Sequence, residues 1–137
     1  MVFAPHVETA SGILLPDDYL RAVARALERG VARSTDLVAR CGGEEFAAVL
    51  PCTDSAGAIN LAEQMRTGVL AQGLEHAHSA THNHVTISLG VATLVPQADE
   101  SPQALVDLAD AALYEAKSAG RNTFRFFDPQ MQAKLMA

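Results

Sequence analysis

Hydrophobic positions recur along the chain with two different periods, which predict its helices and strands. A spacing of three to four residues predicts a helix over 17–30, another that begins after Asp54, and a third that begins after Ser101 and ends at Gly120. Strict alternation predicts a strand over 85–92, and shorter apolar runs predict strands over 36–41, 46–50 and 123–127. The expected buried positions of the second and third helices are Ala58, Ile59, Ala62, Met65 and Val69, then Leu105, Leu108, Ala109, Ala112, Leu113 and Ala116.

The order of these elements favours an α+β fold, in which helices flank a mainly antiparallel sheet. The 137 residues suit one domain over 1–137. The two ends carry weaker signals. Val2–Ala4 suits the start of a strand, but Pro5 interrupts it, and residues 128–137 are expected to form a frayed tail.

Composition excludes several classes of protein. The chain has 10 Lys and Arg against 16 Asp and Glu, so its net charge of -6 argues against binding a nucleic acid polymer. The sequence contains no apolar run long enough to cross a membrane. Cys41 and Cys52 do not face each other in the expected register, so both are expected to be free thiols. We therefore expect a cytoplasmic location.

The segment between the strands 36–41 and 46–50 concentrates unusual residues. Gly42 and Gly43 supply the positive φ of a tight hairpin, and one of them exceeds what the turn needs. Glu44 and Glu45 follow directly. Two carboxylates beside open backbone suit Mg²⁺ with ligand phosphates completing its shell, whereas solvated charges at a hairpin tip are the simpler interpretation.

Two further groups of charged or ligating side chains have both a structural and a functional interpretation. Lys117 and Arg121 lie near a predicted helix C-terminus, where they either complement the helix dipole or bind a polyphosphate. Four histidines between residues 76 and 84 could bind Zn²⁺ or Ni²⁺, or could belong to a polar loop. These histidines are His76, His78, His82 and His84.

Taken in order, the motifs of the chain resemble the GGDEF domain of diguanylate cyclases. The hairpin Leu37–Pro51 contains Gly-Gly-Glu-Glu-Phe, and residues 85–92 read Val-Thr-Ile-Ser-Leu-Gly-Val-Ala. Residues 109–117 read Ala-Asp-Ala-Ala-Leu-Tyr-Glu-Ala-Lys, and residues 120–122 read Gly-Arg-Asn. The resemblance extends from about Gly12 to Phe127 and implies a palm-like sheet with a ferredoxin-like core.

The resemblance implies a bacterial signalling enzyme that condenses two GTP molecules into cyclic di-GMP and releases two pyrophosphates. Each domain of a homodimer would hold one GTP, with Mg²⁺ or Mn²⁺ as cofactor. Glu44 and Glu45 would be the catalytic and metal-binding carboxylates. The substrate-binding residues would be Gly42, Gly43, Asp17, Lys117 and Arg121.

The resemblance also implies a site for product inhibition at Arg33 and Asp36, an Arg-x-x-Asp pair five residues before the glycines. Arg can bind a phosphate or a guanine edge, and Asp can accept from guanine N–H groups. The alternative is a surface Arg and an Asp at a strand entry. The family often adds an Arg where this chain has Gln64.

The chain departs from the family pattern in its N-terminal part. Ile13 and Pro16 replace the family's usual His and Gly around Asp17, and residues 1–11 lack the Asp that the family's first strand carries. Three explanations remain open: a truncated N-terminus, a substitute strand formed by Val2–Val7, or a strand from a partner chain. Two functions besides catalysis remain open as well, a degenerate domain that senses cyclic di-GMP and a dimerisation module.

Overall fold

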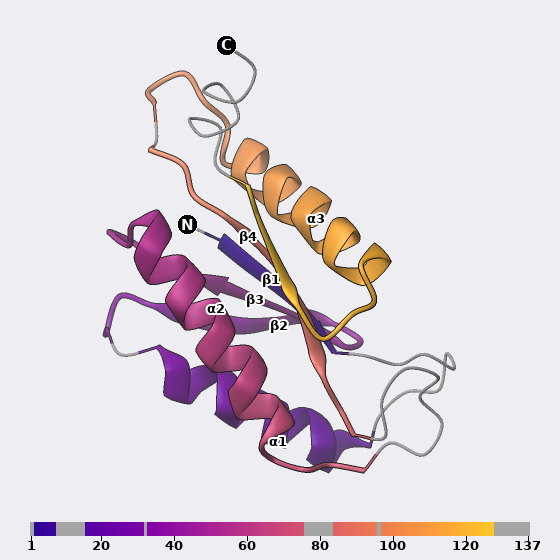
Figure 1. Cartoon of the computed structure of the whole chain (residues 1–137). Coiled ribbons are helices and arrows are strands. Elements are labelled where there is room, and N and C mark those ends of the chain that lie inside the picture. The colour runs from indigo at the N-terminus through magenta and orange to yellow at the C-terminus, as the bar shows by residue number, and fades with distance from the viewer. Residues whose placement is uncertain (1, 8–15, 32, 76–83, 96, 128–137) are drawn as a thin grey trace.

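The computed structural model describes residues 2–7, 16–31, 33–75, 84–95 and 97–127, with residues 2–7 described for their backbone only. Five strands and three helices make up this part of the chain (Figure 1). In chain order they are β1 (Val2–Val7), α1 (Asp17–Gly30), β2 (Leu37–Gly42), β3 (Glu45–Val49), α2 (Ser55–Leu70), β4 (Ile87–Ala92), α3 (Pro102–Ser118) and β5 (Phe124–Phe127).

The helices begin where the sequence provides acceptors for their first N–H groups. The Asp54 side chain accepts from the Gly57 backbone N–H at 2.8 Å, and the Ser101 hydroxyl accepts from the Gln103 N–H at 3.2 Å. Helix α1 has no side-chain cap, but Asp17 lies in its first turn, where a carboxylate complements the helix dipole. All three helices begin within one or two residues of the predicted positions.

The strands form one sheet in the order β2-β3-β1-β4-β5. All neighbouring pairs are antiparallel except β4 and β5, which are parallel. The mainly antiparallel sheet agrees with the prediction. Strand β4 is shorter than expected, because Val85 and Thr86 precede the paired segment.

Strand β1 occupies the centre of the sheet. Of the three explanations for the unusual N-terminal part, a substitute strand at Val2–Val7 is the one that agrees with the structure. Pro5 does not end the strand, contrary to the expectation. It is paired in register with Leu89 of β4, while the ladder toward β3 pairs Val2, Phe3 and His6 and omits the residues between them. Proline has no backbone N–H, and the gap in the β3 ladder accommodates that missing donor.

The two faces of the sheet are covered by different helices. The main core contains Leu20, Val23 and Leu27 of α1, Met65 and Val69 of α2, and Ile87, Leu89 and Val91 of β4, which places α1 and α2 on one face. Helix α3 covers the opposite face of β4 and β5 (Figure 1). The predicted buried positions are confirmed, except that Ile59, Leu105 and Leu108 are half-buried.

Helix α3 approaches the sheet unusually closely at Gly90. A Cβ atom at this position would lie 2.0 Å from the Ala109 carbonyl oxygen and 2.4 Å from the Leu113 backbone nitrogen. The helix backbone therefore rests directly on the β4 backbone. Ala109, Ala112 and Ala116 complete this contact with small, fully buried side chains.

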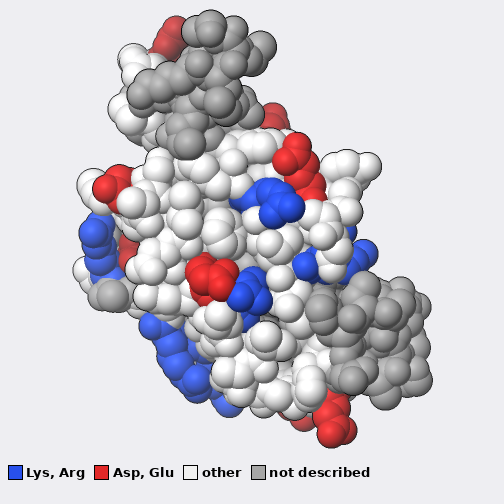
Figure 2. All heavy atoms as spheres, viewed as in Figure 1, with Lys and Arg blue, Asp and Glu red and all other residues white. Residues whose placement is uncertain are grey.

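Three features describe the exterior of the protein: its charged side chains, the apolarity of its helices and its cysteines. In the face shown in Figure 2, Lys and Arg side chains lie interspersed with Asp and Glu and form no extended basic area. Within the described ranges, none of the helices combines the length and apolarity that a membrane span requires. Cys41 and Cys52 are both free and exposed.

Candidate functional site

The turn of the β2–β3 hairpin has a backbone conformation that favours glycine. Gly42 has φ 135° and Gly43 has φ 52°. Arg40 pairs with Phe46 and Gly42 pairs with Glu45, so β2 carries one extra residue in a bulge just before the turn. The Arg40 Nε–H donates to the Gly43 carbonyl oxygen at 2.8 Å and holds the turn in this shape.

The space beside these two glycines is open. A Cβ atom at Gly42 or Gly43 would have no heavy atom within 4 Å. The glycines are therefore required by the backbone conformation and not by crowding. Both glycines have positive φ, so the expectation that one of them exceeds what the turn needs is wrong. The backbone of the turn is open to close approach, and ligand binding there stays a prediction.

The two glutamates that follow the glycines have different environments. Glu44 is buried, with 6% of its surface exposed, whereas Glu45 is exposed at the first position of β3. Consecutive residues that enter a strand point to opposite sides. The pair therefore presents one shielded and one open carboxylate rather than two adjacent ligands on one side.

Helix α3 brings further charges to the open carboxylate. Burial raises the pKa of Asp110 above its ordinary value, the negative charges of Glu45 and Asp107 raise it further, and the positive charge of Lys117 lowers it. Glu45 of the hairpin and Lys117 of the helix thus lie within electrostatic reach of the same aspartate. The fold brings these two predicted site residues together across 72 positions of sequence.

The C-terminal end of α3 turns sharply into β5. Gly120, Arg121 and Asn122 have φ values of 107°, 66° and 45°, three consecutive left-handed residues. The Arg121 backbone N–H donates to the Ala116 carbonyl oxygen at 3.2 Å and closes the helix. Lys117 lies in the last turn of α3 and Arg121 in the turn that follows the helix, and both are half-buried.

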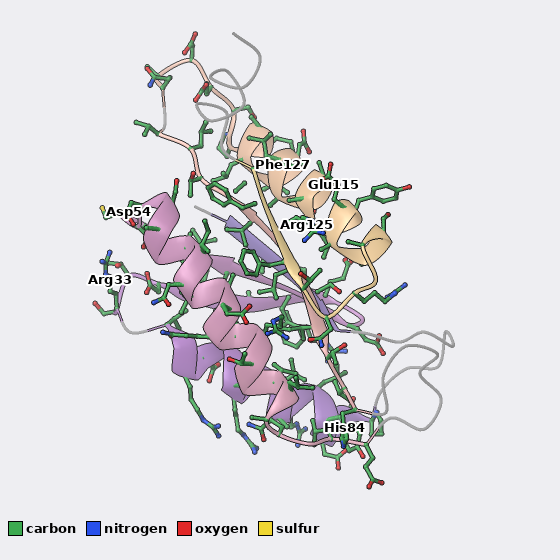
Figure 3. The ribbon with its side chains drawn as sticks, viewed as in Figure 1. Arg33, Asp54, His84, Glu115, Arg125 and Phe127 are labelled. Carbon is green, nitrogen blue, oxygen red and sulfur yellow. The ribbon has the colours of Figure 1, made fainter. Side chains whose placement is uncertain are left out.

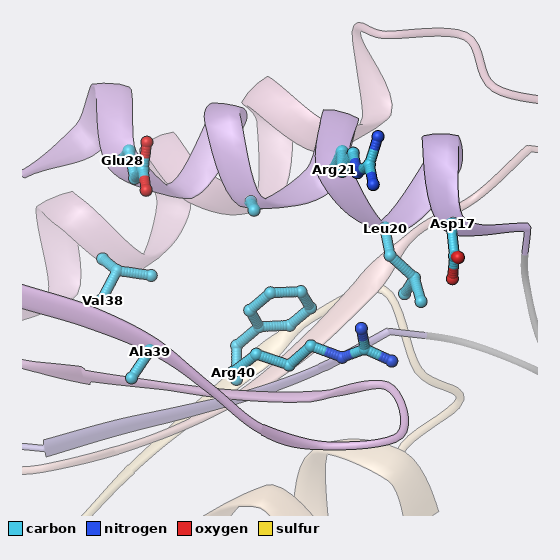
Figure 4. Close-up of a pocket in the computed structure, with 9 residues that line it drawn as sticks. Asp17, Leu20, Arg21, Glu28, Val38, Ala39 and Arg40 are labelled. Atoms are coloured by element: carbon cyan, nitrogen blue, oxygen red, sulfur yellow. The ribbon is translucent and has the colours of Figure 1, made fainter.

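A cavity of about 250 Å³ lies between α1 and the β2–β3 hairpin (Figure 4). Its wall includes Asp17, which the sequence predicted as a site residue, and Arg40, whose guanidinium extends toward the end of α1 that carries Asp17 (Figure 4). The other lining residues are Leu20, Arg21, Ala24, Glu28, Val38, Ala39 and Phe46. This volume is below the ~300–1,000 Å³ of pockets that enclose whole drug-sized ligands, so it suits one part of a larger ligand.

The carboxylates fit a divalent metal only in part. Among the residues that the structure describes, no group of three or more His, Cys, Asp or Glu side chains is arranged to hold a metal ion. Strand β1 contains no Asp or Glu to add a ligand next to the hairpin. Mg²⁺ is often bound by one or two carboxylates together with substrate phosphates, and the shielded carboxylate of Glu44 suits that shared arrangement, whereas Glu45 is exposed on the opposite side.

Arg33 and Asp36 lie at the other end of the hairpin from the glycine turn. The Arg33 backbone N–H donates to Asp36 Oδ2 at 3.3 Å, and Arg33 Nη1 donates to the Cys52 carbonyl oxygen at 2.8 Å. The structure therefore brings the two predicted residues into contact (Figure 3 labels Arg33). At ~3.3 Å per residue, the six-residue strand β2 separates them from the turn by about 20 Å.

Several residues near these sites had no predicted role. Arg66 of α2 donates to the Asn122 side-chain oxygen at 3.1 Å, and Asp110 lies beside Glu45 and Lys117. The spacing of Glu63 and Arg66, three apart on a helix, is a sequence signal for their own ion pair and not for the contact of Arg66 with Asn122. Of the four clustered histidines, His76, His78 and His82 lie outside the described residues, and His84 is exposed.

Comparison with known families gives one match that covers most of the chain. The family described as "Diguanylate cyclase, GGDEF domain" matches residues 6–123. "Response regulator PleD" of Caulobacter vibrioides is 38% identical over 120 residues, which is 88% of this chain and 26% of that protein. The chain therefore spans about a quarter of the length of this curated relative.

Solved structures agree with this match. The "active GGEEF domain of a diguanylate cyclase from Vibrio cholerae" superposes with a TM-score of 0.72 at 26% identity, covering 92% of this chain and 81% of that one. The GGDEF domain of DgcB from Caulobacter crescentus, solved in complex with c-di-GMP, gives a TM-score of 0.72 at 27% identity, covering 93% and 75%. These similarities confirm the predicted α+β palm-like fold.

Proposed function

Because the chain belongs to the diguanylate cyclase GGDEF family, we propose that it is a cyclase domain that condenses two GTP molecules into cyclic di-GMP. Cyclic di-GMP synthesis is the activity of the family, and its assignment to this chain is the proposal. One observation carries it: the open glycine turn leads into the shielded carboxylate of Glu44, and the same hairpin lines a cavity together with Asp17. The Vibrio cholerae neighbour, described as active, is named for the same Gly-Gly-Glu-Glu-Phe turn.

The cavity and the turn suggest how GTP would lie. The guanine would enter the cavity, where the Asp17 carboxylate can accept from guanine N–H groups. The triphosphate would follow the open backbone of Gly42 and Gly43, which no side chain covers. Lys117 and Arg121 would bind its oxygens through charge-assisted hydrogen bonds.

The reaction requires two such domains in a homodimer. The 3′-oxygen of each GTP attacks the α-phosphorus of the other, forming a new P–O bond. The bond from that phosphorus to the pyrophosphate breaks, and the proton of the 3′-hydroxyl leaves. The protein contributes mainly by orienting the two nucleotides and stabilising charge, which can supply most of the acceleration of a phosphoryl transfer.

A divalent cation, Mg²⁺ or Mn²⁺, would be held by Glu44, with Glu45 assisting, and by the phosphates of the bound GTP. When bound, it would neutralise charge on the triphosphate. The family uses divalent metal ions, and the identity of the ion here is part of the proposal. Because β1 adds no carboxylate, we expect weak binding of the metal in the absence of nucleotide.

Product inhibition would act through Arg33 and Asp36. Asp36 accepts from the Arg33 backbone N–H, and the Arg33 guanidinium donates to the Pro51 and Cys52 carbonyl oxygens, so both side chains start from the end of the hairpin remote from the turn. Cyclic di-GMP offers phosphates to the guanidinium and guanine N–H groups to the carboxylate. The DgcB neighbour, solved with c-di-GMP, supports binding of this ligand by the fold.

A second candidate function is a domain that binds cyclic di-GMP without making it. The observation that favours it is the absence of any acidic residue from β1, so the central strand next to the hairpin supplies no carboxylate. In this case the Arg33 and Asp36 site would function without catalysis. The two candidates differ in whether the chain converts GTP.

The test is a GTP turnover assay with Mg²⁺ and then Mn²⁺, in which cyclic di-GMP is quantified by chromatography. We expect the parental protein to form product and Glu44→Gln, which keeps the shape of the side chain, to form none while remaining folded. Glu100→Gln is the matched control, because Glu100 lies in an exposed loop before α3. Product formation by Glu44→Gln at the parental rate would refute the role of this carboxylate. A parental protein that binds cyclic di-GMP and makes none would establish the sensor instead.

A further inference from the structure

Arg66 connects helix α2 to the turn between α3 and β5. Its Nη1 group donates to Asn122 Oδ1 at 3.1 Å, a contact between residues 56 positions apart. Its other donors go to the Glu63 carboxylate, with Nε to Oε2 at 2.9 Å and Nη2 to Oε1 at 2.5 Å. Glu63 therefore holds the planar guanidinium of Arg66 through two parallel hydrogen bonds. This orientation directs the Nη1 group of Arg66 toward Asn122.

The turn that receives this hydrogen bond has a strained backbone. Arg121 and Asn122, which are not glycines, have φ values of 66° and 45°. Left-handed conformations of residues other than glycine are unfavourable, and they persist where surrounding contacts enforce them. The Arg121 amide is held from the α3 side by Ala116, and the Asn122 side chain is held from the α2 side by Arg66.

The charges of the contact favour its persistence at neutral pH. The hydrogen bond with Arg66 lowers the pKa of Glu63, and the same bond raises the pKa of Arg66. The side chains are 46% and 20% exposed respectively, so solvent screening limits their effect on overall stability.

We propose that Arg66, oriented by Glu63, is a positioning residue for Arg121: it fixes the turn so that the Arg121 guanidinium meets the phosphates of GTP. The inference rests on the proposed function, which assigns phosphate binding to Arg121. Arg66 itself would not touch the nucleotide. Its contribution would pass through Asn122 and the backbone of the turn to the adjacent arginine.

A double-mutant cycle tests this dependence. GTP binding is measured by calorimetry, in Ca²⁺ to prevent turnover, for the parental protein, Arg66→Met, Arg121→Ala and the double variant. We expect Arg66→Met to weaken GTP binding about three- to tenfold, and to cause no further loss once Arg121 is already alanine. Arg66→Lys should restore little, because lysine lacks the forked geometry. The matched control is Arg25→Met, the same substitution at an exposed position of α1.

A second measurement does not depend on GTP. Hydrogen exchange of the Arg121 amide, which is bonded to Ala116, should be faster in Arg66→Met than in the parental protein and unchanged in Arg25→Met. If the parental protein binds GTP and the losses at Arg66 and Arg121 multiply independently, the positioning role is overturned and the proposed function stands. Unchanged exchange in Arg66→Met overturns the positioning role as well. If the parental protein does not bind GTP, the proposed function is overturned, and with it the role of Arg66 in nucleotide binding.

Discussion

Replacing Gly90 with alanine should destabilise the protein, because helix α3 rests on the backbone at this position. The added Cβ would lie 2.0 Å from the Ala109 carbonyl oxygen and 2.4 Å from the Leu113 nitrogen. Both atoms belong to the backbone in the middle of α3, so no side-chain rotation relieves the overlap. To restore ordinary contact distances of ~3.4 Å, the helix must move away from the sheet by about 1 Å or more.

The cost of this movement can be bounded from the contact itself. Inserting a methyl group into a packed interior costs about 1–3 kcal/mol, and a clash with backbone belongs at the upper end. For a chain of this length, a loss of ~3 kcal/mol corresponds to a fall in Tm of about 10 °C. The displacement would also move Lys117 and Arg121, so GTP binding should weaken in the molecules that remain folded.

The assay is thermal and urea unfolding of Gly90→Ala beside a matched glycine substitution. Gly68 lies within helix α2, and a Cβ there would have no heavy atom within 4 Å. Gly68→Ala should therefore raise the free energy of unfolding by about 0.5–1 kcal/mol, since alanine is the better helix former. Equal stability of the two variants, or a Gly90→Ala protein as stable as the parent, would refute the close approach of α3.

Three other predictions concern the site and its surroundings. The specific rate of cyclic di-GMP synthesis should fall when the protein is diluted below its dimer dissociation constant, and a constant rate from a demonstrated monomer would contradict the two-site reaction. Arg33→Ala should weaken cyclic di-GMP binding in calorimetry and raise the final yield of product, whereas unchanged affinity would show that product binds elsewhere. The folded-state pKa of Glu63 lies below its ordinary value of 4.5, so its stabilising effect is complete above that value and is lost as the pH falls through the folded pKa. The difference in unfolding free energy between the parental protein and Glu63→Gln should accordingly shrink from about pH 6 to about pH 3, and a difference independent of pH would contradict the ion pair.

The elements with strong local signals were predictable from the sequence. Asp54 and Ser101 cap their helices as expected, and the glycine pair marked the hairpin turn correctly. In each case the decisive interaction lies within a few residues of the signal. The periodicity of apolar residues then fixed which face of each helix is buried.

Strand β1 was only one of three alternatives that the sequence left open, because the evidence that decides it is not local. A proline in a short apolar segment argues against a central strand. Only the pairing with β3 on one side and β4 on the other shows that the missing N–H of Pro5 falls at a gap in one ladder. Position in a sheet depends on partners that are distant in sequence.

For the candidate site, the sequence named residues whose roles stay predictions, and it did not indicate how the fold arranges them. Neighbouring letters in the sequence suggested that Glu44 and Glu45 act alike, but the fold shields the first and exposes the second. The contact of Arg66 with Asn122 joins residues that no period or motif connects. Such relations arise from tertiary packing, which single-sequence patterns do not encode.

The central position of β1 has a mechanical consequence for the site. In the described sheet, β3 and β4 do not pair with each other, so β1 is the joint between the β2–β3 hairpin and the β4–β5 pair. The glycine turn belongs to one side of this joint, and Lys117 and Arg121, through α3, belong to the other. Shear or slippage of a six-residue strand would alter the spacing between carboxylates and cations without touching any of them. A force applied along that strand would therefore change the width of the gap where the triphosphate is proposed to lie.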